Sequence, residues 1–126
     1  MPFIHIKSLP FDESLDVSAV LENLNKDFAE ETGIDVQHVS STWEFFPSGH
    51  YAVGEKSANH HTQDSHPVLI DLLVPDFNSA EHIETMLSSI ASSLAKHSNI
   101  RRDNIFINAR TAQSGMVFDR GEVVRW

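Results

Sequence analysis

The chain has 126 residues, 40% of them hydrophobic and 21% charged, which is typical of one folded globular domain and too short for two. It contains no cysteine, so disulfide bonds and thiolate chemistry are excluded. Its formal net charge of −9 repels nucleic-acid phosphates, so we expect no nucleic-acid partner.

The first half of the chain has the predicted order strand, helix, strand. Residues 2–7 combine β-branched and aromatic side chains, as strands do. A helix follows, because apolar residues recur at helical spacing, at Val17, Val20, Leu21, Leu24 and Phe28. Gly33 stands where a left-handed helix cap is expected, and residues 39–46 are again typical of a strand.

The second half repeats this order. Residues 67–74 predict a strongly apolar strand. Asn78, with Glu81 three residues later, predicts the capping box of a helix. The apolar face of that helix consists of Ile83, Met86, Leu87, Ile90 and Leu94. Asn99 then takes the cap position, and residues 105–109 are typical of a strand.

A constant offset of 66 residues relates the two halves. It holds for all five positions of each helix face, for the two cap residues, and for the strands that begin at Val39 and Ile105. Because a shared cap and strand in one register do not follow from apolar helices alone, we infer an internal duplication. The repeats cover about residues 2–56 and 67–110.

Two tandem β-α-β units predict an α/β (α+β) fold, with a four-stranded mixed sheet and both helices on one face, in a single domain of residues 1–126. The strands at 67–74 and 105–110 are largely apolar on both faces, and two helices cover only one. The other face therefore needs a partner, which favours an oligomer. Residues 116–126 predict a C-terminal β-hairpin that adds strands across a subunit boundary.

Pro2 is the sharpest single feature for chemistry. A small second residue allows Met1 to be removed, which leaves a secondary amine at the N-terminus. A free α-amine titrates near pH ~8, and apolar neighbours such as Phe3 lower its pKa by desolvating the charged form. Such an amine can act as a general base near neutral pH. The alternative is an ordinary proline, since about 5% of residues in any protein are prolines.

Several short motifs follow one another in a set order: Thr32-Gly33, Glu44, Gly49-His50-Tyr51, and Asp103 with Ile105-Phe106-Ile107-Asn108. Together with Pro2 and the duplication they resemble the tautomerase superfamily, which includes macrophage migration inhibitory factor and 5-carboxymethyl-2-hydroxymuconate isomerase. The resemblance implies Pro2 as the catalytic base, Phe106 and Asn108 as pocket residues, and Tyr51 facing the proline. It also implies a homotrimer whose sheets form a barrel, and no cofactor.

The cations that hold the substrate carboxylate in this superfamily are not in their usual places. Ile34 replaces a lysine after the Thr-Gly turn, and residues 8–14 and 39–41 contain no arginine. Arg110, at the end of a second-repeat strand, is the best substitute by position, followed by Arg101 and Arg102. The alternative for each arginine is a solvated surface charge.

Phe106 and Asn108 lie two residues apart and therefore share one strand face. In a pocket, Phe106 supplies an apolar wall and Asn108 a hydrogen-bond donor to a carbonyl oxygen. The alternatives are core packing for Phe106 and an edge hydrogen bond for Asn108. Tyr51, the single tyrosine, is either a pocket acid or a partly buried aromatic.

His60, His61 and His66 lie in or beside a polar stretch, residues 56–65, that predicts a solvated loop. Metal sites need fixed spacing on rigid elements, which this stretch lacks, so we expect no metal site there. We also expect Pro2 and Phe106 to lie within side-chain reach of each other in a pocket at a subunit boundary.

The leading hypothesis for function is proton transfer alpha to the carbonyl of a small 2-oxo acid, with the nitrogen of Pro2 moving the proton. Asn108, Tyr51 or Arg110 then stabilises the enolate oxygen or the carboxylate. One rival is a non-catalytic oligomeric binding protein on the same fold. A third possibility is a hydratase or dehalogenase in which the protonated proline acts as an acid. No signal peptide and no long apolar segment is visible, so we expect a cytoplasmic protein without membrane contact.

Overall fold

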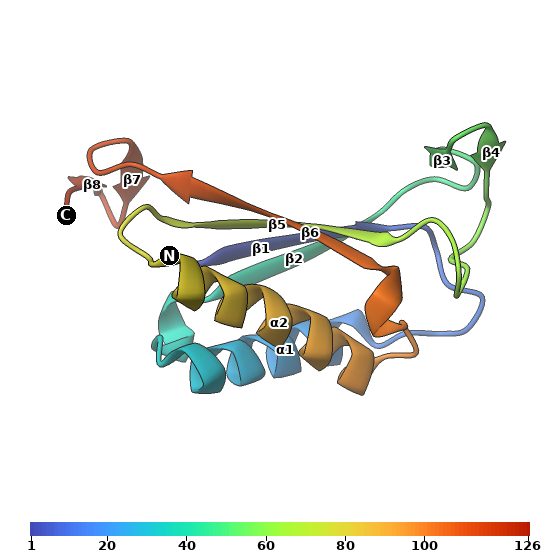
Figure 1. Cartoon of the computed structure of the whole chain (residues 1–126), viewed down its shortest axis with the longest axis horizontal. Coiled ribbons are helices and arrows are strands. Elements are labelled where there is room, and N and C mark those ends of the chain that lie inside the picture. The colour runs from blue at the N-terminus through green and yellow to red at the C-terminus, as the bar shows by residue number, and fades with distance from the viewer.

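The computed structural model describes residues 1–126, and its centre is a four-stranded mixed sheet with the strand order β2-β1-β5-β6. The strands are β1 Phe3–Ser8, β2 Ser40–Phe45, β5 Val68–Pro75 and β6 Ile105–Ala112. β1 runs parallel to β2 and antiparallel to β5, and β5 runs parallel to β6. The helices α1 Val17–Thr32 and α2 Ala80–His97 both lie beneath one face of the sheet (Figure 1). The predicted fold class is confirmed.

The smaller elements complete each half. The 3₁₀ turns Val36–His38 and Arg102–Asn104 lead into β2 and β6. One hairpin pairs β3 Ala52–Val53 with β4 Lys56–Ser57, and the C-terminal hairpin pairs β7 Val117–Asp119 with β8 Glu122–Val124. The two hairpins lie at opposite ends of the sheet (Figure 1). No helix combines the length and the apolar character needed to cross a membrane.

The duplication extends into these hairpins. The amide of Gly49 donates to the carbonyl of Ala58 at 3.0 Å, and the amide of Gly115 donates to the carbonyl of Val124 at 2.9 Å, again 66 residues on. Both glycines have positive φ, 80° and 84°, which a residue with a Cβ adopts only at a cost. The C-terminal hairpin is therefore the counterpart of β3–β4, and the second repeat continues through it.

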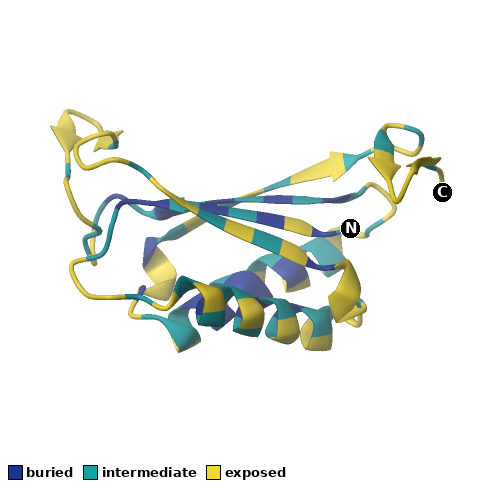
Figure 2. Cartoon of the chain, turned by 180° about the vertical axis from the view of Figure 1, so that it is seen from behind, coloured by how far each residue is buried: buried dark blue, intermediate teal, exposed yellow.

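The core lies between the sheet and the helices. Alternate residues of β5 are buried, so that Val68, Ile70, Leu72 and Val74 face the helices. The helices meet them with two triads of buried side chains, which also differ by 66: Val20, Leu24 and Phe28 in α1, and Met86, Ile90 and Leu94 in α2. Figure 2 shows burial along the middle of the strands and the inner helix surfaces, while the hairpins are largely exposed. The predicted helix faces are confirmed.

Two of the predicted cap residues are wrong. Gly33 does cap α1 in the left-handed region, with φ 75°. In α2, however, Ser79 and not Asn78 is the N-cap, because its hydroxyl accepts the amide of His82 at 3.1 Å. At the other end of α2 the chain leaves through extended Ser98, whose hydroxyl donates to Leu94 and accepts the amide of Ile100. No left-handed residue is needed, so Asn99 is not a cap.

The second face of the sheet has no helix over it (Figure 1). Its middle is formed by alternate residues of three strands: Phe3, His5 and Lys7 of β1, Leu69, Asp71 and Leu73 of β5, and Phe106, Asn108 and Arg110 of β6. We call these nine residues the open face. The prediction of two largely apolar faces needs correction, because an Asp71–Arg110 ion pair lies in the middle of this one.

Candidate functional site

The largest cavity of the chain, about 730 Å³, opens at the N-terminal end of β1. The start of β1 forms one side and the hairpin β7–β8 the other. Pro2 lines this cavity together with residues from distant parts of the chain, among them His38, Phe77, Phe118, Arg120 and Trp126. We call it the Pro2 pocket.

The sheet fixes Pro2 in place. Its carbonyl accepts a hydrogen bond from the amide of Ser40 at 3.0 Å, where β2 begins beside β1. Pro2 is itself buried, and the next residue, Phe3, already belongs to the strand. Because the ring and carbonyl are held by the sheet, a nitrogen at this position has a defined place in the pocket.

The pocket also controls the charge of the chain terminus. With Met1 in place the terminal amine belongs to Met1, which lines the pocket. Burial lowers the pKa of this amine, while the carboxylate of Asp119 raises it and the guanidinium of Arg120 lowers it. Removal of Met1 leaves the amine on Pro2, one residue deeper in the chain.

An aromatic wall lies on the hairpin side of the pocket. The rings of Phe77 and Trp126 meet edge to face, with centroids 5.9 Å apart. Trp126 is anchored by its indole N–H, which donates to Asp76 at 2.8 Å, and by its amide, which donates to Ser114 at 2.8 Å. Phe118, in β7, is 73% exposed. Sequence reasoning found the hairpin but missed these three residues; the offset of 66, carried past residue 110, places only Phe118 opposite a residue of the β3–β4 hairpin, Ala52.

Arg110 does not reach Pro2. Its Nε donates to both carboxylate oxygens of Asp71, at 2.9 and 3.1 Å, and its Nη2 also donates to that group. These hydrogen bonds lower the pKa of Asp71 and raise the pKa of Arg110. Arg101 is paired with Asp103 at 2.6 Å, and Arg102 donates to two serines, Ser88 and Ser92. None of these three predicted arginines lines the Pro2 pocket.

Phe106 and Asn108 share the open face, as predicted, but lie away from Pro2 within one chain. Phe106 is aligned with Leu69, whereas Phe3, which follows Pro2, is aligned with Leu73. Those rows are four residues apart, or about 13 Å along the strands. Phe106 and Pro2 are therefore not within side-chain reach in one chain. Phe106 is 57% exposed, so it is not a core residue.

Tyr51 lies at the opposite end of the sheet from Pro2. Its hydroxyl donates to the carbonyl of Pro67 at 2.9 Å, and its ring contacts Phe46 and His66 edge to face. Burial raises the pKa of Tyr51. Within its own chain Tyr51 is thus a partly buried aromatic that anchors the β3–β4 hairpin.

The three histidines of residues 60–66 do not converge on a common point. His60 faces Asp12 at 3.6 Å, while the ring of His61 packs on Phe11 with centroids 4.8 Å apart. His66 is buried, and its two ring nitrogens contact Ser65 and the carbonyl of Lys56. The expectation of a solvated loop is therefore wrong for His66, which is buried just before the first residue of β5.

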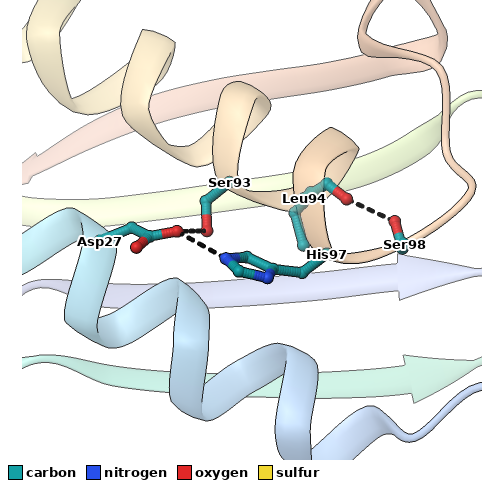
Figure 3. Close-up of polar contacts among 5 residues, drawn as sticks. All are labelled: Asp27, Ser93, Leu94, His97 and Ser98. Carbon is teal, nitrogen blue, oxygen red and sulfur yellow. Dashed lines mark hydrogen bonds and ion pairs between the residues drawn. The ribbon is translucent and has the colours of Figure 1, made fainter.

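A serine, a histidine and an aspartate form a hydrogen-bonded cluster that joins the two helices (Figure 3). Asp27 of α1 accepts hydrogen bonds from Ser93 at 2.7 Å and from His97 at 2.9 Å, both in α2. Burial opposes ionisation of Asp27, but these hydrogen bonds outweigh it and lower its pKa. Both donors bind the carboxylate and not each other, so His97 is not hydrogen-bonded to the serine as the base of a catalytic triad would be. Asp27 and Ser93 are 66 residues apart, so this contact joins equivalent positions of the two repeats.

Solved structures with the same architecture are similar along nearly the whole chain. A fused 4-OT, in an asymmetric trimer, has a TM-score of 0.82 at 10% identity and covers 96% of this chain and 94% of its own. A member of the cis-3-chloroacrylic acid dehalogenase family has a TM-score of 0.78 at 11% identity, over 97% and 82%. Malonate semialdehyde decarboxylase has a TM-score of 0.71 at 14% identity, over 96% and 93%.

No family model and no curated protein matches the sequence itself. With identities of 7% to 14%, the likeness lies in the fold. The TM-scores of 0.71 to 0.82 extend over at least 93% of this chain, so the whole architecture is shared. The fold of this chain is the fold of the tautomerase superfamily.

Proposed function

We propose that the Pro2 amine, once Met1 is removed, moves a proton alpha to the carbonyl of a small 2-oxo acid. The observation that carries this proposal is the place of Pro2: of the five predicted site residues it alone lines the largest cavity. Burial lowers the pKa of the Met1 amine in this pocket, and we expect the same desolvation to favour the neutral form of a Pro2 amine, which a general base requires.

Two structural neighbours support this chemistry. One was solved after inactivation by 2-oxo-3-pentynoate, itself a 2-oxo acid, and has a TM-score of 0.78. Malonate semialdehyde decarboxylase was solved with the proline at its first residue replaced by alanine. The first neighbour is a protein of this fold that a 2-oxo acid inactivates, and in the second the first-residue proline was the one chosen for replacement.

In the proposed reaction the neutral nitrogen of Pro2 accepts the proton from the enol or from the carbon beside the carbonyl, and the ammonium form returns it to the other atom. The phenyl or alkyl part of the substrate packs against Phe77 and Trp126. Tyr51 and Arg110 are engaged in their own chain. Phe106 and Asn108 remain candidates for substrate contact, but only if a second subunit supplies them.

A homotrimer would meet that requirement. Fused 4-OT structures are trimers in both symmetric and asymmetric forms. The open face is uncovered, and Phe3 and Phe106 on it are 40% and 57% exposed. We propose that three copies cover their open faces mutually and bring Phe106 and Asn108 of one chain toward Pro2 of another.

A second reaction, addition of water, is favoured by one observation. Asp119 and Glu122 both line the Pro2 pocket, and the carboxylate of Asp119 opposes the lowering of the terminal amine's pKa that burial causes. A carboxylate could activate water while the protonated amine of Pro2 acts as the acid. The dehalogenase-family neighbour belongs to a branch that is named for an unsaturated acid. The two reactions require opposite protonation states of the amine, so the pH profile separates them.

The test is the rate of ketonisation of phenylenolpyruvate, with protein shown by intact mass to lack Met1. Pro2→Ala should lose about 10²–10⁴-fold, the usual contribution of a general base. The rate should also fall as pH drops through the pKa of the amine, because only the neutral form accepts a proton. Protein that retains Met1 is the matched control and should be as slow as Pro2→Ala.

A Pro2 effect below about tenfold would exclude the amine as the base. A rate that rises as pH falls would favour the water-addition reaction. Weak activity that ignores both Pro2 and pH would leave the non-catalytic binding protein as the better description.

A further inference from the structure

Arg120 occupies an unusual position at the tip of the C-terminal hairpin. β7 ends at Asp119 and β8 begins at Glu122, so Arg120 and Gly121 form a two-residue turn. Both have positive φ, 50° and 86°, as a type I′ turn requires. The first position of such a turn favours Asn, Asp or Gly, and an arginine there is strained. Strain of this kind points to a use for the side chain.

Arg120 lines the Pro2 pocket, and its guanidinium has no carboxylate within ion-pair distance. Arg101 and Arg110 are, by contrast, each paired with an aspartate. Met1 lines the same cavity, and the guanidinium of Arg120 lowers the pKa of its terminal amine. An arginine without a carboxylate partner, in the same cavity as the terminal amine, is a ready site for a carboxylate, to which it can donate two parallel hydrogen bonds.

We infer that Arg120 binds the carboxylate of the substrate, and that the Pro2 pocket selects 2-oxo acids with one carboxylate and an apolar remainder. This inference rests on the proposed function of Pro2. Arg120 would then do the work of the cations that the resemblance to the superfamily led us to expect after the Thr-Gly turn and in residues 8–14 and 39–41.

The charges around Arg120 argue for a single carboxylate. Asp119 and Glu122 are direct cross-strand partners and both line the pocket. One guanidinium is therefore accompanied by two carboxylates, and like charges at such a separation repel. A substrate with a second carboxylate would meet this repulsion without a second arginine to offset it.

The aromatic side chains that line the Pro2 pocket favour a substrate whose part beyond the 2-oxo acid group is apolar. Phe77, Phe118 and Trp126 line the same cavity and are 66%, 73% and 40% exposed. Exposed aromatic side chains gathered in one cavity are typical of a binding surface for apolar groups. Arylpyruvates fit both requirements, since they carry one carboxylate and one aromatic ring.

The test compares Arg120→Gln with Lys26→Gln, which removes the same charge from an exposed position of α1. With phenylenolpyruvate, Arg120→Gln should raise KM about 10- to 100-fold, the usual range for a lost charge-assisted hydrogen bond, whereas kcat should change less. Lys26→Gln should behave as the unmodified protein. The preference for phenylenolpyruvate over the enol of oxaloacetate, a dicarboxylate, should persist in Arg120→Gln, because Asp119 and Glu122, which repel the second carboxylate, remain.

Direct binding keeps this inference separate from the catalytic role of Pro2. Binding of phenylpyruvate to Pro2→Ala protein, followed by calorimetry, should weaken by a similar factor when Arg120→Gln is added. Arg120→Gly relieves the turn and should keep or raise Tm while it weakens binding, so loss of binding is not loss of folding. Unchanged phenylpyruvate binding in both Arg120 variants, or a site that prefers the dicarboxylate, would overturn the inference even if Pro2 proves to be the base.

Discussion

At the scale of single residues, His61 is the clearest polar misfit. Both its ring nitrogens are buried and have no hydrogen-bond partner. Burial accordingly lowers the pKa of His61. A buried polar group without a partner costs about 1–3 kcal/mol, so this position contributes less stability than an apolar side chain of similar size.

We predict that His61→Leu raises the free energy of unfolding, by about 1 kcal/mol at pH 8 and by more at pH 5.5. The pKa of His61 is lower in the folded state than in the unfolded state. Below the ordinary pKa of histidine, about 6.5, the unfolded chain therefore binds more protons, and the stability of the unmodified protein decreases as the pH is lowered. Leucine removes that dependence. Urea unfolding at fixed protein concentration measures both values.

His60→Leu is the matched control. The side chain of His60 is half exposed and faces the exposed carboxylate of Asp12, so its replacement should change stability by no more than about 0.5 kcal/mol. A His61→Leu protein that is less stable than the unmodified chain at both pH values would show that the imidazole has a partner in solution.

The sequence indicated Pro2 because a proline directly after Met1 becomes a terminal secondary amine once Met1 is removed, and that property depends only on its place in the chain. It did not indicate Arg120, because five arginines are equivalent until their partners are known. Which of them is free depends on long-range contacts: Arg110 binds Asp71, 39 residues earlier, on the neighbouring strand. Arg120 can be recognised as a candidate only in the folded chain, where the β7–β8 hairpin and Pro2 line the same cavity.

At the scale of elements, the cluster of Asp27, Ser93 and His97 joins α1 to α2 where the repeats meet (Figure 3). Ser93 is only 3% exposed, so its hydroxyl has no access to an alternative partner in bulk water. Removal of the carboxylate leaves this donor unsatisfied.

We predict that Asp27→Ala lowers the free energy of unfolding by about 1–3 kcal/mol at neutral pH. The lowered pKa of Asp27 means that its contribution is present above the ordinary pKa of a carboxyl and is lost as pH falls through the folded value. The gap between the variant and the unmodified chain should therefore narrow in acid. Glu30→Ala, on the exposed side of the same helix, should have little effect. A constant gap from pH 7 to pH 2 would contradict the assigned role.

The helices were predictable because their apolar period of 3.6 is a local property of the sequence, and the main strands because β-branched, aromatic and other apolar residues gather in short runs. The helix ends were less so: Asn78 and Ser79 are both good N-caps, and the choice depends on backbone geometry. The β3–β4 hairpin has only two residues in each strand and no alternating pattern. Its resemblance to β7–β8 is visible in hydrogen bonds and not in side chains.

At the scale of the whole molecule, the open face decides the state of association. Its apolar members, Phe3, Leu69, Leu73 and Phe106, surround the paired charges of Asp71 and Arg110. An isolated chain would leave this surface in water, although one face of an antiparallel pair commonly tolerates that. The exposed phenylalanines and the trimeric structural neighbours favour burial between copies.

We predict a homotrimer of about 42 kDa, three chains of 14.1 kDa, by light scattering at micromolar concentration. Phe106→Glu should shift the mass toward one chain, because it places a charge on the open face beside Leu69, where burial would cost several kcal/mol. The fold of the single chain should survive, since Phe106 is largely exposed within it. Thr85→Glu, on the outer surface of α2, adds the same charge and should leave the mass unchanged.

If Phe106 also serves the Pro2 pocket of a neighbouring chain, the Phe106→Glu variant should lose ketonisation activity together with assembly. A monodisperse particle near 14 kDa for the unmodified protein would exclude the trimer, and the Pro2 pocket would then have to work with the residues of one chain.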